Sequence, residues 1–142
     1  MKQFLIASHG MLASGLKSSI QILTGAGEKL QTIDAYLDDK PVDIGKEMDH
    51  FISGIDAKDV AVVFTDLVGG SVNREVLLRT EAHSNIFVIS SVNLPTVLAV
   101  LLDTEELTKT RLESIIKSTQ VELVSIDQNT SNDTDDIDDF LS

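Results

Sequence analysis

The sequence of 142 residues contains no cysteine and no tryptophan, and only 4% of its residues are aromatic. Without cysteine the chain can form no disulfide, no thiolate metal site and no cysteine nucleophile. The scarcity of aromatic side chains leaves leucine, isoleucine and valine to build most of the core. Hydrophobic residues still make up 42% of the chain, which is typical of a globular domain and not of a disordered segment.

Long hydrophobic runs are also absent. The longest, Leu94–Leu102, is far shorter than the roughly 20 residues that span a bilayer. The apolar run that ends before Ser8 is too short for the roughly 7–15 apolar residues of a signal peptide. We therefore expect a cytoplasmic protein with no direct membrane insertion.

Basic residues are few: 11 Lys and Arg stand against 23 Asp and Glu, for a net charge of −12. Such a chain is repelled by the phosphate backbone of nucleic acids, and no basic cluster compensates for this. Residues 127–142 contain six Asp and neither Lys nor Arg, so we expect a flexible acidic tail after a domain that spans residues 1–126. Protein or small-molecule partners are favoured, and no nucleic acid.

Short apolar runs alternate with segments of helical spacing. The runs that predict strands are Gln3–Ser8, Leu30–Leu37, Asp59–Thr65, Asn85–Ser90 and Val121–Ile126. Apolar residues three to four apart predict helices over Leu12–Leu23, Ile44–Ile55, from Val72, from Pro95, and over Glu105–Ser118. The third run, V-A-V-V-F, is almost continuously apolar, which indicates a parallel sheet covered on both faces. The predicted fold class is α/β, a three-layer sandwich with a mostly parallel, doubly wound sheet.

Two polar stretches follow predicted strands: Ser8-His9-Gly10 after the first, and Thr65-Asp66 with the residues beyond it after the third. If the strand order begins 2-1-3, these two strand ends meet at the switch point, where doubly wound sheets bind ligands. His9 and Asp66 would then lie together. A carboxylate bound to one imidazole nitrogen leaves the other as a directed base or nucleophile.

Gly69-Gly70-Ser71 opens the helix that follows this third strand. Glycines let the backbone approach a ligand closely, and the free N–H groups at a helix start bind anions. A phosphoryl group on His9 would fit there, with the Ser71 hydroxyl as a further donor. Each of these signals alone is more often structural; their joint placement favours function.

The other two histidines, His50 and His83, are interpreted as structural or surface residues. No cluster of His, Asp or Glu has the spacing of metal ligands, and the sequence contains no G-x-G-x-x-G, Walker loop or nucleophile elbow. We therefore expect neither a metal nor a cofactor.

The same residues resemble the IIA component of the mannose family (mannose, fructose and sorbose) of the bacterial sugar phosphotransferase system. The motifs are S-H-G at 8–10, F-T-D-L-V-G-G-S at 64–71 with Asn73 beyond, and V-N-L-P at 92–95. The resemblance runs from Gln3 to about Ile126, and it is the order and spacing of the three motifs together that make it specific. The family often has glycine where this chain has Ser91.

The resemblance implies a definite reaction. His9 would accept a phosphoryl group on Nε2 from the phosphocarrier protein HPr and pass it to a IIB domain, whose membrane partners IIC and IID import and phosphorylate the sugar. Asp66 would orient His9 through Nδ1, and Gly69, Gly70 and Ser71 would bind the phosphoryl group. The sugar itself is not readable from the chain, because IIA components do not touch it.

The resemblance also implies quaternary structure. Family members form homodimers in which a C-terminal strand, here Val121–Ile126, is added antiparallel to the edge of a sheet ordered 2-1-3-4. The alternative function is a regulatory or signalling module that carries the same phosphohistidine. Two further alternatives are weaker: a receiver domain phosphorylated on Asp66 would need an acidic pair where His9 stands, and a hydrolase using His9 and Ser71 would need a nucleophile elbow.

Overall fold

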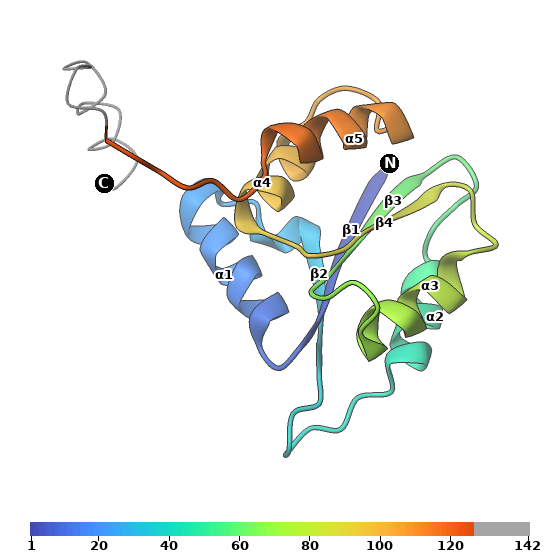
Figure 1. Ribbon diagram of the computed structural model, residues 1–142. Coiled ribbons are helices and arrows are strands. Elements are labelled where there is room, and N and C mark those ends of the chain that lie inside the picture. The colour runs from blue at the N-terminus through green and yellow to red at the C-terminus, as the bar shows by residue number, and fades with distance from the viewer. Residues whose placement is uncertain (127–142) are drawn as a thin grey trace.

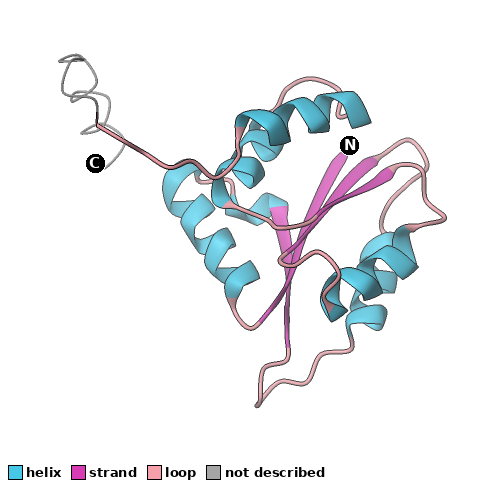
Figure 2. Ribbon diagram, in the orientation of Figure 1, coloured by secondary structure: helices cyan, strands magenta, loops and turns pink. Residues whose placement is uncertain are grey.

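The computed structural model describes residues 1–126, in which one β-sheet lies between two layers of helices (Figures 1 and 2). The strands are β1 (Lys2–His9), β2 (Leu30–Ala35), β3 (Val60–Thr65) and β4 (Ile86–Ile89). The helices are α1 (Leu12–Thr24), the short 3₁₀ turn η1 (Gly27–Lys29), α2 (Ile44–Ser53), α3 (Ser71–Thr80), α4 (Leu94–Leu102) and α5 (Lys109–Ser118). The acidic segment 127–142 lies outside the described residues.

All four strands are parallel, and their order is β2-β1-β3-β4. This confirms the predicted α/β sandwich and the strand order. In the register, His9 of β1 pairs with Ala35 of β2, and Ala7 pairs with Thr65 of β3. The carboxyl ends of β2, β1 and β3 therefore lie side by side at one end of the sheet, and the residues that follow these strands meet there.

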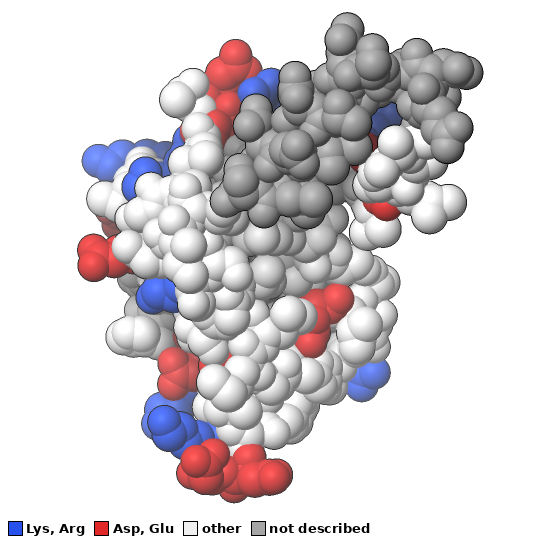
Figure 3. All heavy atoms as spheres, turned by 90° about the vertical axis from the view of Figure 1, so that its left-hand side faces the viewer, with Lys and Arg blue, Asp and Glu red and all other residues white. Residues whose placement is uncertain are grey.

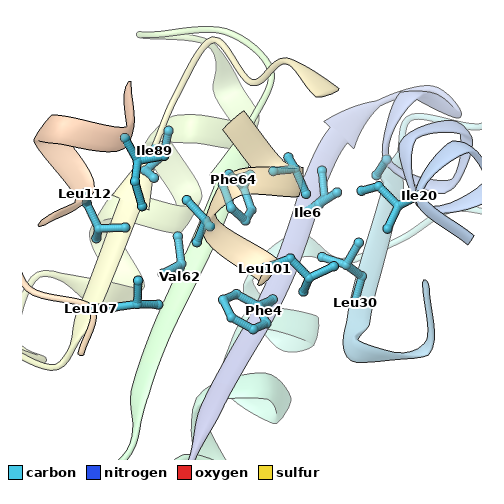
Figure 4. Close-up of a cluster of buried hydrophobic side chains, with 14 residues drawn as sticks. Phe4, Ile6, Ile20, Leu30, Val62, Phe64, Ile89, Leu101, Leu107 and Leu112 are labelled. Atoms are coloured by element: carbon cyan, nitrogen blue, oxygen red, sulfur yellow. The ribbon is translucent and has the colours of Figure 1, made fainter. Parts of the chain in front are cut away.

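The two faces of β1 pack against different helices. Phe4 and Ile6 belong to a hydrophobic cluster with α1, α4 and α5, whose members Figure 4 shows. Leu5 and Ala7 belong to a second cluster with α2 and α3. Burial on both sides explains why the strand sequences are almost continuously apolar and not alternating. It also holds the backbone of β1, and thus of the residue at its end, in place.

The expected antiparallel edge strand, Val121–Ile126, is wrong for the single chain. These residues are irregular, and they run away from the sheet beyond α5 (Figure 1). Val121 is 91% exposed and Leu123 is 99% exposed. A strand needs a neighbour for its backbone N–H and C=O groups, and this segment does not reach an edge of its own sheet.

The helix expected over Glu105–Ser118 starts later than predicted. The Thr108 hydroxyl accepts a hydrogen bond from the backbone N–H of Arg111, which begins α5 there. Arg111, in the first turn of α5, donates from Nε and Nη2 to the two carboxylate oxygens of Asp103, which precedes the helix, at 2.7 and 2.9 Å. Lys2 Nζ also donates to the backbone carbonyl of Asp103. The hydrogen bonds from Arg111 lower the pKa of Asp103 to about 2, and they outweigh the opposing effect of burial.

Candidate active site

His9 is the last residue of β1, one of the two central strands, at the edge where the strand ends gather. Gly10 has a φ of +58° and turns the chain out of the strand, and its N–H donates to the carbonyl of Ala35 at 2.8 Å. The side chain of His9 is 40% exposed. The sheet thus fixes the backbone of His9 and leaves its ring accessible.

Asp66 directly follows β3 and lies against His9. Its Oδ2 accepts two hydrogen bonds from His9, from the backbone N–H at 2.7 Å and from the ring Nδ1 at 2.9 Å. Its Oδ1 accepts the backbone N–H of Leu67 at 3.0 Å. Because an ionised carboxylate only accepts hydrogen bonds, Nδ1 is the protonated nitrogen of the neutral ring. The lone pair of His9 is therefore on Nε2, the nitrogen that faces away from Asp66.

The Asp66 carboxylate is held in its ionised form. Its side chain is 9% exposed, and this burial by itself raises its pKa. Hydrogen bonds from the backbone N–H and the ring of His9 lower the pKa, as does the positive charge of that ring when it is protonated. Together they outweigh the effect of burial and hold the pKa of Asp66 below its usual value of 3.8. The carboxylate that orients His9 is thus ionised at neutral pH.

Helix α3 starts beside the accessible nitrogen of His9. Ser71 Oγ lies 3.4 Å from His9 Nε2. A Cβ on Gly70 would stand 3.6 Å from His9 Cε1, so the loop backbone passes close to the ring at this glycine. Gly69 has a φ of +76°, a conformation that favours glycine, and it turns the chain toward the helix. The three residues predicted to bind a phosphoryl group thus all lie next to His9 or in the turn leading to it.

The first turn of α3 differs from those of the other described helices. In those, a side chain accepts a hydrogen bond from a first-turn N–H: Asp43 in α2, Asn93 in α4, Thr108 in α5, and Ser8 and Asp34 in α1. No side chain of residues 1–126 caps α3. Uncapped N–H groups at a helix start, where the helix dipole is positive, favour an anion. Among the described α-helices, α3 alone has no side-chain acceptor for its first-turn N–H groups, and it begins beside the His9 ring.

Sequence reasoning missed Tyr36. The second strand, expected to run to Leu37, ends before Tyr36, because this residue takes the left-handed conformation with a φ of +63°. Its ring stacks on that of His9, with centroids 5.1 Å and planes 27° apart. Its hydroxyl donates to Ser71 Oγ at 2.9 Å. The strand order contained the signal, since the residue after β2 reaches the same edge as His9.

A buried polar cluster beneath the site was also missed. Thr65 Oγ1 and Ser90 Oγ both donate to Asn73 Oδ1, at 2.8 and 2.5 Å, and the two hydroxyls lie 2.8 Å apart. Thr65 ends β3, Ser90 follows β4 and Asn73 belongs to the first turn of α3. The cluster ties the start of α3 to the ends of two strands. It thereby fixes the far side of the loop that contains the two glycines.

The remaining histidines are not part of this site. His50 lies exposed on α2. His83 precedes β4, at the end of the sheet where the strands begin, opposite to the end with His9. Within residues 1–126, no group of three or more His, Asp or Glu side chains could hold a metal ion. None of the helices in this part of the chain is long and apolar enough to cross a membrane.

A comparison with protein families identifies the family of this chain. A family model described as the PTS system fructose IIA component matches residues 3–120. The chain belongs to this family of mannose-type IIA components. It is therefore a component of a sugar phosphotransferase system, and its matched region contains His9, Asp66 and the whole start of α3.

Solved structures agree with this assignment. A phosphoenolpyruvate-dependent sugar phosphotransferase permease from Klebsiella pneumoniae, described as putative, is 27% identical, with a TM-score of 0.67 over 83% of this chain and 82% of that one. The IIA protein associated with the fucose utilisation operon of Streptococcus pneumoniae is 20% identical, with a TM-score of 0.71 over 96% of each chain. The mannose/sorbose-specific IIA subunit from Enterococcus faecalis is 18% identical, with a TM-score of 0.71 over 89% of this chain and all of that one. The last two, at this identity, show the shared fold.

The structure bears on Ser91, where the resemblance leads us to expect glycine. The φ of Ser91 is +55°, in the left-handed region. Glycine adopts that conformation without strain, whereas serine does so at a cost. The backbone turn that leads from β4 to the V-N-L-P segment thus has a conformation that suits glycine better than the serine present.

Proposed function

We propose that His9 carries a phosphoryl group on Nε2, which it accepts from the phosphocarrier protein HPr and passes to a IIB domain. The observation that carries the proposal is the combination at the His9 ring. Asp66 occupies Nδ1 and leaves Nε2 as the nucleophile, and the uncapped start of α3 lies next to that nitrogen. A nucleophile beside an anion site is what transfer of a phosphoryl group requires.

The proposed transfer needs no proton to move. The lone pair of His9 Nε2 attacks the phosphorus atom, and the bond between phosphorus and the donor histidine nitrogen breaks. Its electron pair stays on the donor ring, which leaves as a neutral imidazole when its other nitrogen carries a proton. The His9 ring keeps its Nδ1 proton and gains a positive charge, which the Asp66 carboxylate offsets. Transfer to the IIB domain follows the same steps, with His9 as the donor.

The start of α3 would hold the oxygens of the phosphoryl group. The N–H groups of its first turn provide donors, and the Ser71 hydroxyl, 3.4 Å from Nε2, provides another. Gly70 allows this approach, because a Cβ there would stand only 3.3 Å from Leu67 Cβ and would contact the His9 ring at 3.6 Å. In phosphoryl transfer between proteins, positioning of this kind and electrostatic stabilisation supply most of the catalysis.

The surface around His9 suits docking of protein partners. Large apolar side chains are exposed at its rim: Met11 in the turn before α1, and Leu67 and Val68 in the loop after Asp66. The side of the molecule over α1 is largely uncharged across its middle (Figure 3). Exposed apolar side chains around a reactive group indicate a surface that partners cover in turn. HPr and the IIB domain would both use this rim, since both must reach Nε2.

Docking at the rim has a matched test. Leu67 is 59% exposed at the rim and Leu78 is 58% exposed on α3, so the two substitutions to alanine remove the same side chain at the same exposure. Leu67→Ala should raise the KM for phospho-HPr about fivefold, the effect of a moderate interface contact. Leu78→Ala should leave KM unchanged. Equal effects of the two substitutions would contradict docking at this rim.

The phosphoryl step is tested by incubating the protein with Enzyme I, HPr and labelled phosphoenolpyruvate. We expect one phosphoryl group per chain, labile in acid and stable in base, as a phosphohistidine is. Label that remains in His9→Ala, or the opposite stability, would refute the proposal. The structure gives a reason to expect no label on Asp66, since both of its oxygens already accept hydrogen bonds from N–H groups.

Addition of a IIB domain then separates transport from signalling. A carrier passes its label to the IIB domain, and the labelled fraction of this protein falls as that of the IIB domain rises. A regulatory module with the same phosphohistidine would retain the label. No feature of the described residues favours the regulatory alternative.

The proposal includes a homodimer. Within residues 121–126 the four apolar side chains, Val121, Leu123, Val124 and Ile126, are all exposed, and the outer edge of β4 has no neighbouring strand within the described residues. An antiparallel strand from a second copy would satisfy that edge and bury both Val121 and Leu123. Light scattering should give the mass of two chains, and Leu123→Asp should give the mass of one. A monomeric wild-type protein would refute the dimer.

A further inference from the structure

Tyr36 holds the His9 ring and the Ser71 hydroxyl at the same time. Its ring is stacked on His9, with centroids 5.1 Å apart, and its hydroxyl donates to Ser71 Oγ at 2.9 Å. We propose that Tyr36 is a positioning residue for phosphoryl transfer: it orients the nucleophile from one side of its ring and presents the Ser71 hydroxyl to the phosphoryl group. This inference rests on the proposed role of His9.

The backbone of Tyr36 suggests a role beyond packing. Its φ of +63° lies in the left-handed region, which costs conformational energy for a residue with a bulky side chain. Its side chain is 59% exposed, so burial in the core does not explain why a tyrosine is held there. The contacts to His9 and Ser71 are what this conformation provides. Backbone strain of this kind is concentrated at functional sites.

The hydroxyl of Tyr36 sets the direction of the hydrogen on Ser71. Because Ser71 Oγ accepts the Tyr36 hydrogen, its own hydrogen is free to point toward the lone pair of His9 Nε2. At 3.4 Å this contact is too long to engage the lone pair strongly, and Nε2 stays available for attack. After the transfer, the same Ser71 hydrogen faces an oxygen of the phosphoryl group.

The aromatic ring of Tyr36 acts on His9 directly. The stacked arrangement limits rotation of the imidazole, which Asp66 holds at Nδ1 and Tyr36 covers on one face. The His9 ring becomes positively charged when it is phosphorylated. A cation within about 6 Å of the face of an aromatic ring is attracted to it. The 5.1 Å separation meets this condition, so the stack favours the phosphorylated form more than the free one.

Two substitutions separate these effects. Tyr36→Phe removes the hydroxyl and keeps the ring, and we expect it to slow single-turnover phosphorylation at saturating phospho-HPr about fivefold, the effect of one hydrogen bond. Tyr36→Asn removes both, while asparagine tolerates the left-handed backbone, and we expect a rate lower by about 20-fold. Because the residue is exposed, Tyr36→Phe should unfold at the wild-type temperature, and Tyr36→Asn should unfold at that temperature or higher, since asparagine relieves the left-handed strain.

A double-mutant cycle with Ser71 decides whether the hydroxyl acts through that residue. Tyr36→Phe should slow transfer in the wild-type background and have no effect in a Ser71→Ala background. An equal effect in both backgrounds, or a change in KM with no change in the saturated rate, would refute the inference and leave Tyr36 as a docking residue.

An NMR measurement on the unphosphorylated protein adds a readout that does not depend on transfer. The ¹⁵N and ¹H signals of the His9 ring should shift in Tyr36→Asn, because the ring current is lost, and stay close to wild type in Tyr36→Phe. Unchanged signals in Tyr36→Asn would refute the stack. Absence of label on the wild-type protein would refute the proposed function, whereas labelled wild type with unaffected Tyr36 variants would refute this inference alone.

Discussion

Replacement of Asp66 by asparagine tests the electrostatic part of the proposed mechanism. The amide is nearly the same size as the carboxylate, and its oxygen can occupy the position of Oδ2, which accepts from the backbone N–H and Nδ1 of His9. The NH₂ group then faces the backbone N–H of Leu67, so that one loop hydrogen bond is lost. The orientation of the His9 ring is retained and the negative charge is removed.

The expected size of the effect follows from the geometry. Two unit charges about 4 Å apart attract each other by about 4 kcal/mol at the effective dielectric constant of a protein near its surface. With about half of the positive charge developed on the His9 ring in the transition state, Asp66 contributes about 2 kcal/mol. Loss of this contribution slows transfer about 30-fold, since about 1.4 kcal/mol corresponds to a factor of ten. Asp66→Ala also releases the ring, and we expect it to be slower still.

The assay is single-turnover transfer from phospho-HPr, measured by rapid quenching with labelled phosphate. Asp34→Asn is the matched control, because Asp34 lies at the same sheet edge and its carboxylate also accepts backbone and side-chain hydrogen bonds, but from Ser14 and not from His9. The transfer rate of Asp34→Asn should remain within about twofold of wild type, since Asp34 makes its hydrogen bonds with Ser14 and does not contact the His9 ring, where the charge develops. An Asp66→Asn rate as close to wild type as this control would show that Asp66 is only a turn residue.

Three further outcomes are expected. Gly70→Ala should fold, because its φ of −70° suits alanine, but its methyl group would stand only 3.3 Å from Leu67 Cβ and would shift the loop beside His9, so labelled-phosphoenolpyruvate assays should show slower phosphorylation. The carboxyl of Asp103 has its pKa lowered from 3.8 to about 2, so its pairing with Arg111 stabilises the fold above pH 3.8 and is lost as the pH falls toward 2. Urea unfolding between these pH values should therefore show a steeper loss of stability in the wild type than in Asp103→Asn. Ser91→Gly should raise the free energy of unfolding by about 0.5–1 kcal/mol, since relief of the left-handed strain exceeds the added freedom of the unfolded chain, and an unchanged or lower value would contradict this reading of the turn.

Much of the fold could be predicted because the composition of each strand reflects how deeply the strand is buried. The run V-A-V-V-F of β3 is apolar at every position, and Val62 and Val63 are indeed buried on opposite faces of the sheet. The C-terminal run, V-E-L-V-S-I, has the composition of a strand as well. The described residues bring no edge of the sheet within its reach, however, and a sequence pattern does not show whether a neighbouring strand is present.

Residues of the site could be predicted where their chemistry is distinctive. A histidine at the end of one central strand and a carboxylate at the end of the next come together by strand order alone. The hydrogen bonds that join Thr65, Asn73 and Ser90 could not be predicted, because hydroxyl and amide groups are common at strand ends and only coordinates show that these three converge. Tyr36 was missed for a similar reason. Its predicted strand ran past it, and only its left-handed backbone turns the ring toward His9.

The exposure of His9 explains why its contacts matter. In the proposed function, a phosphoryl group arrives from one protein and leaves to another through the same accessible nitrogen, so the ring cannot be held by burial in the core. It is held instead by the hydrogen bonds to Asp66 at one edge and by the Tyr36 ring on one face, while β1, buried on both sides, fixes the backbone. An open site of this kind depends on a few directed contacts and not on packing. Single substitutions there should change the rate of transfer strongly and the stability of the fold little.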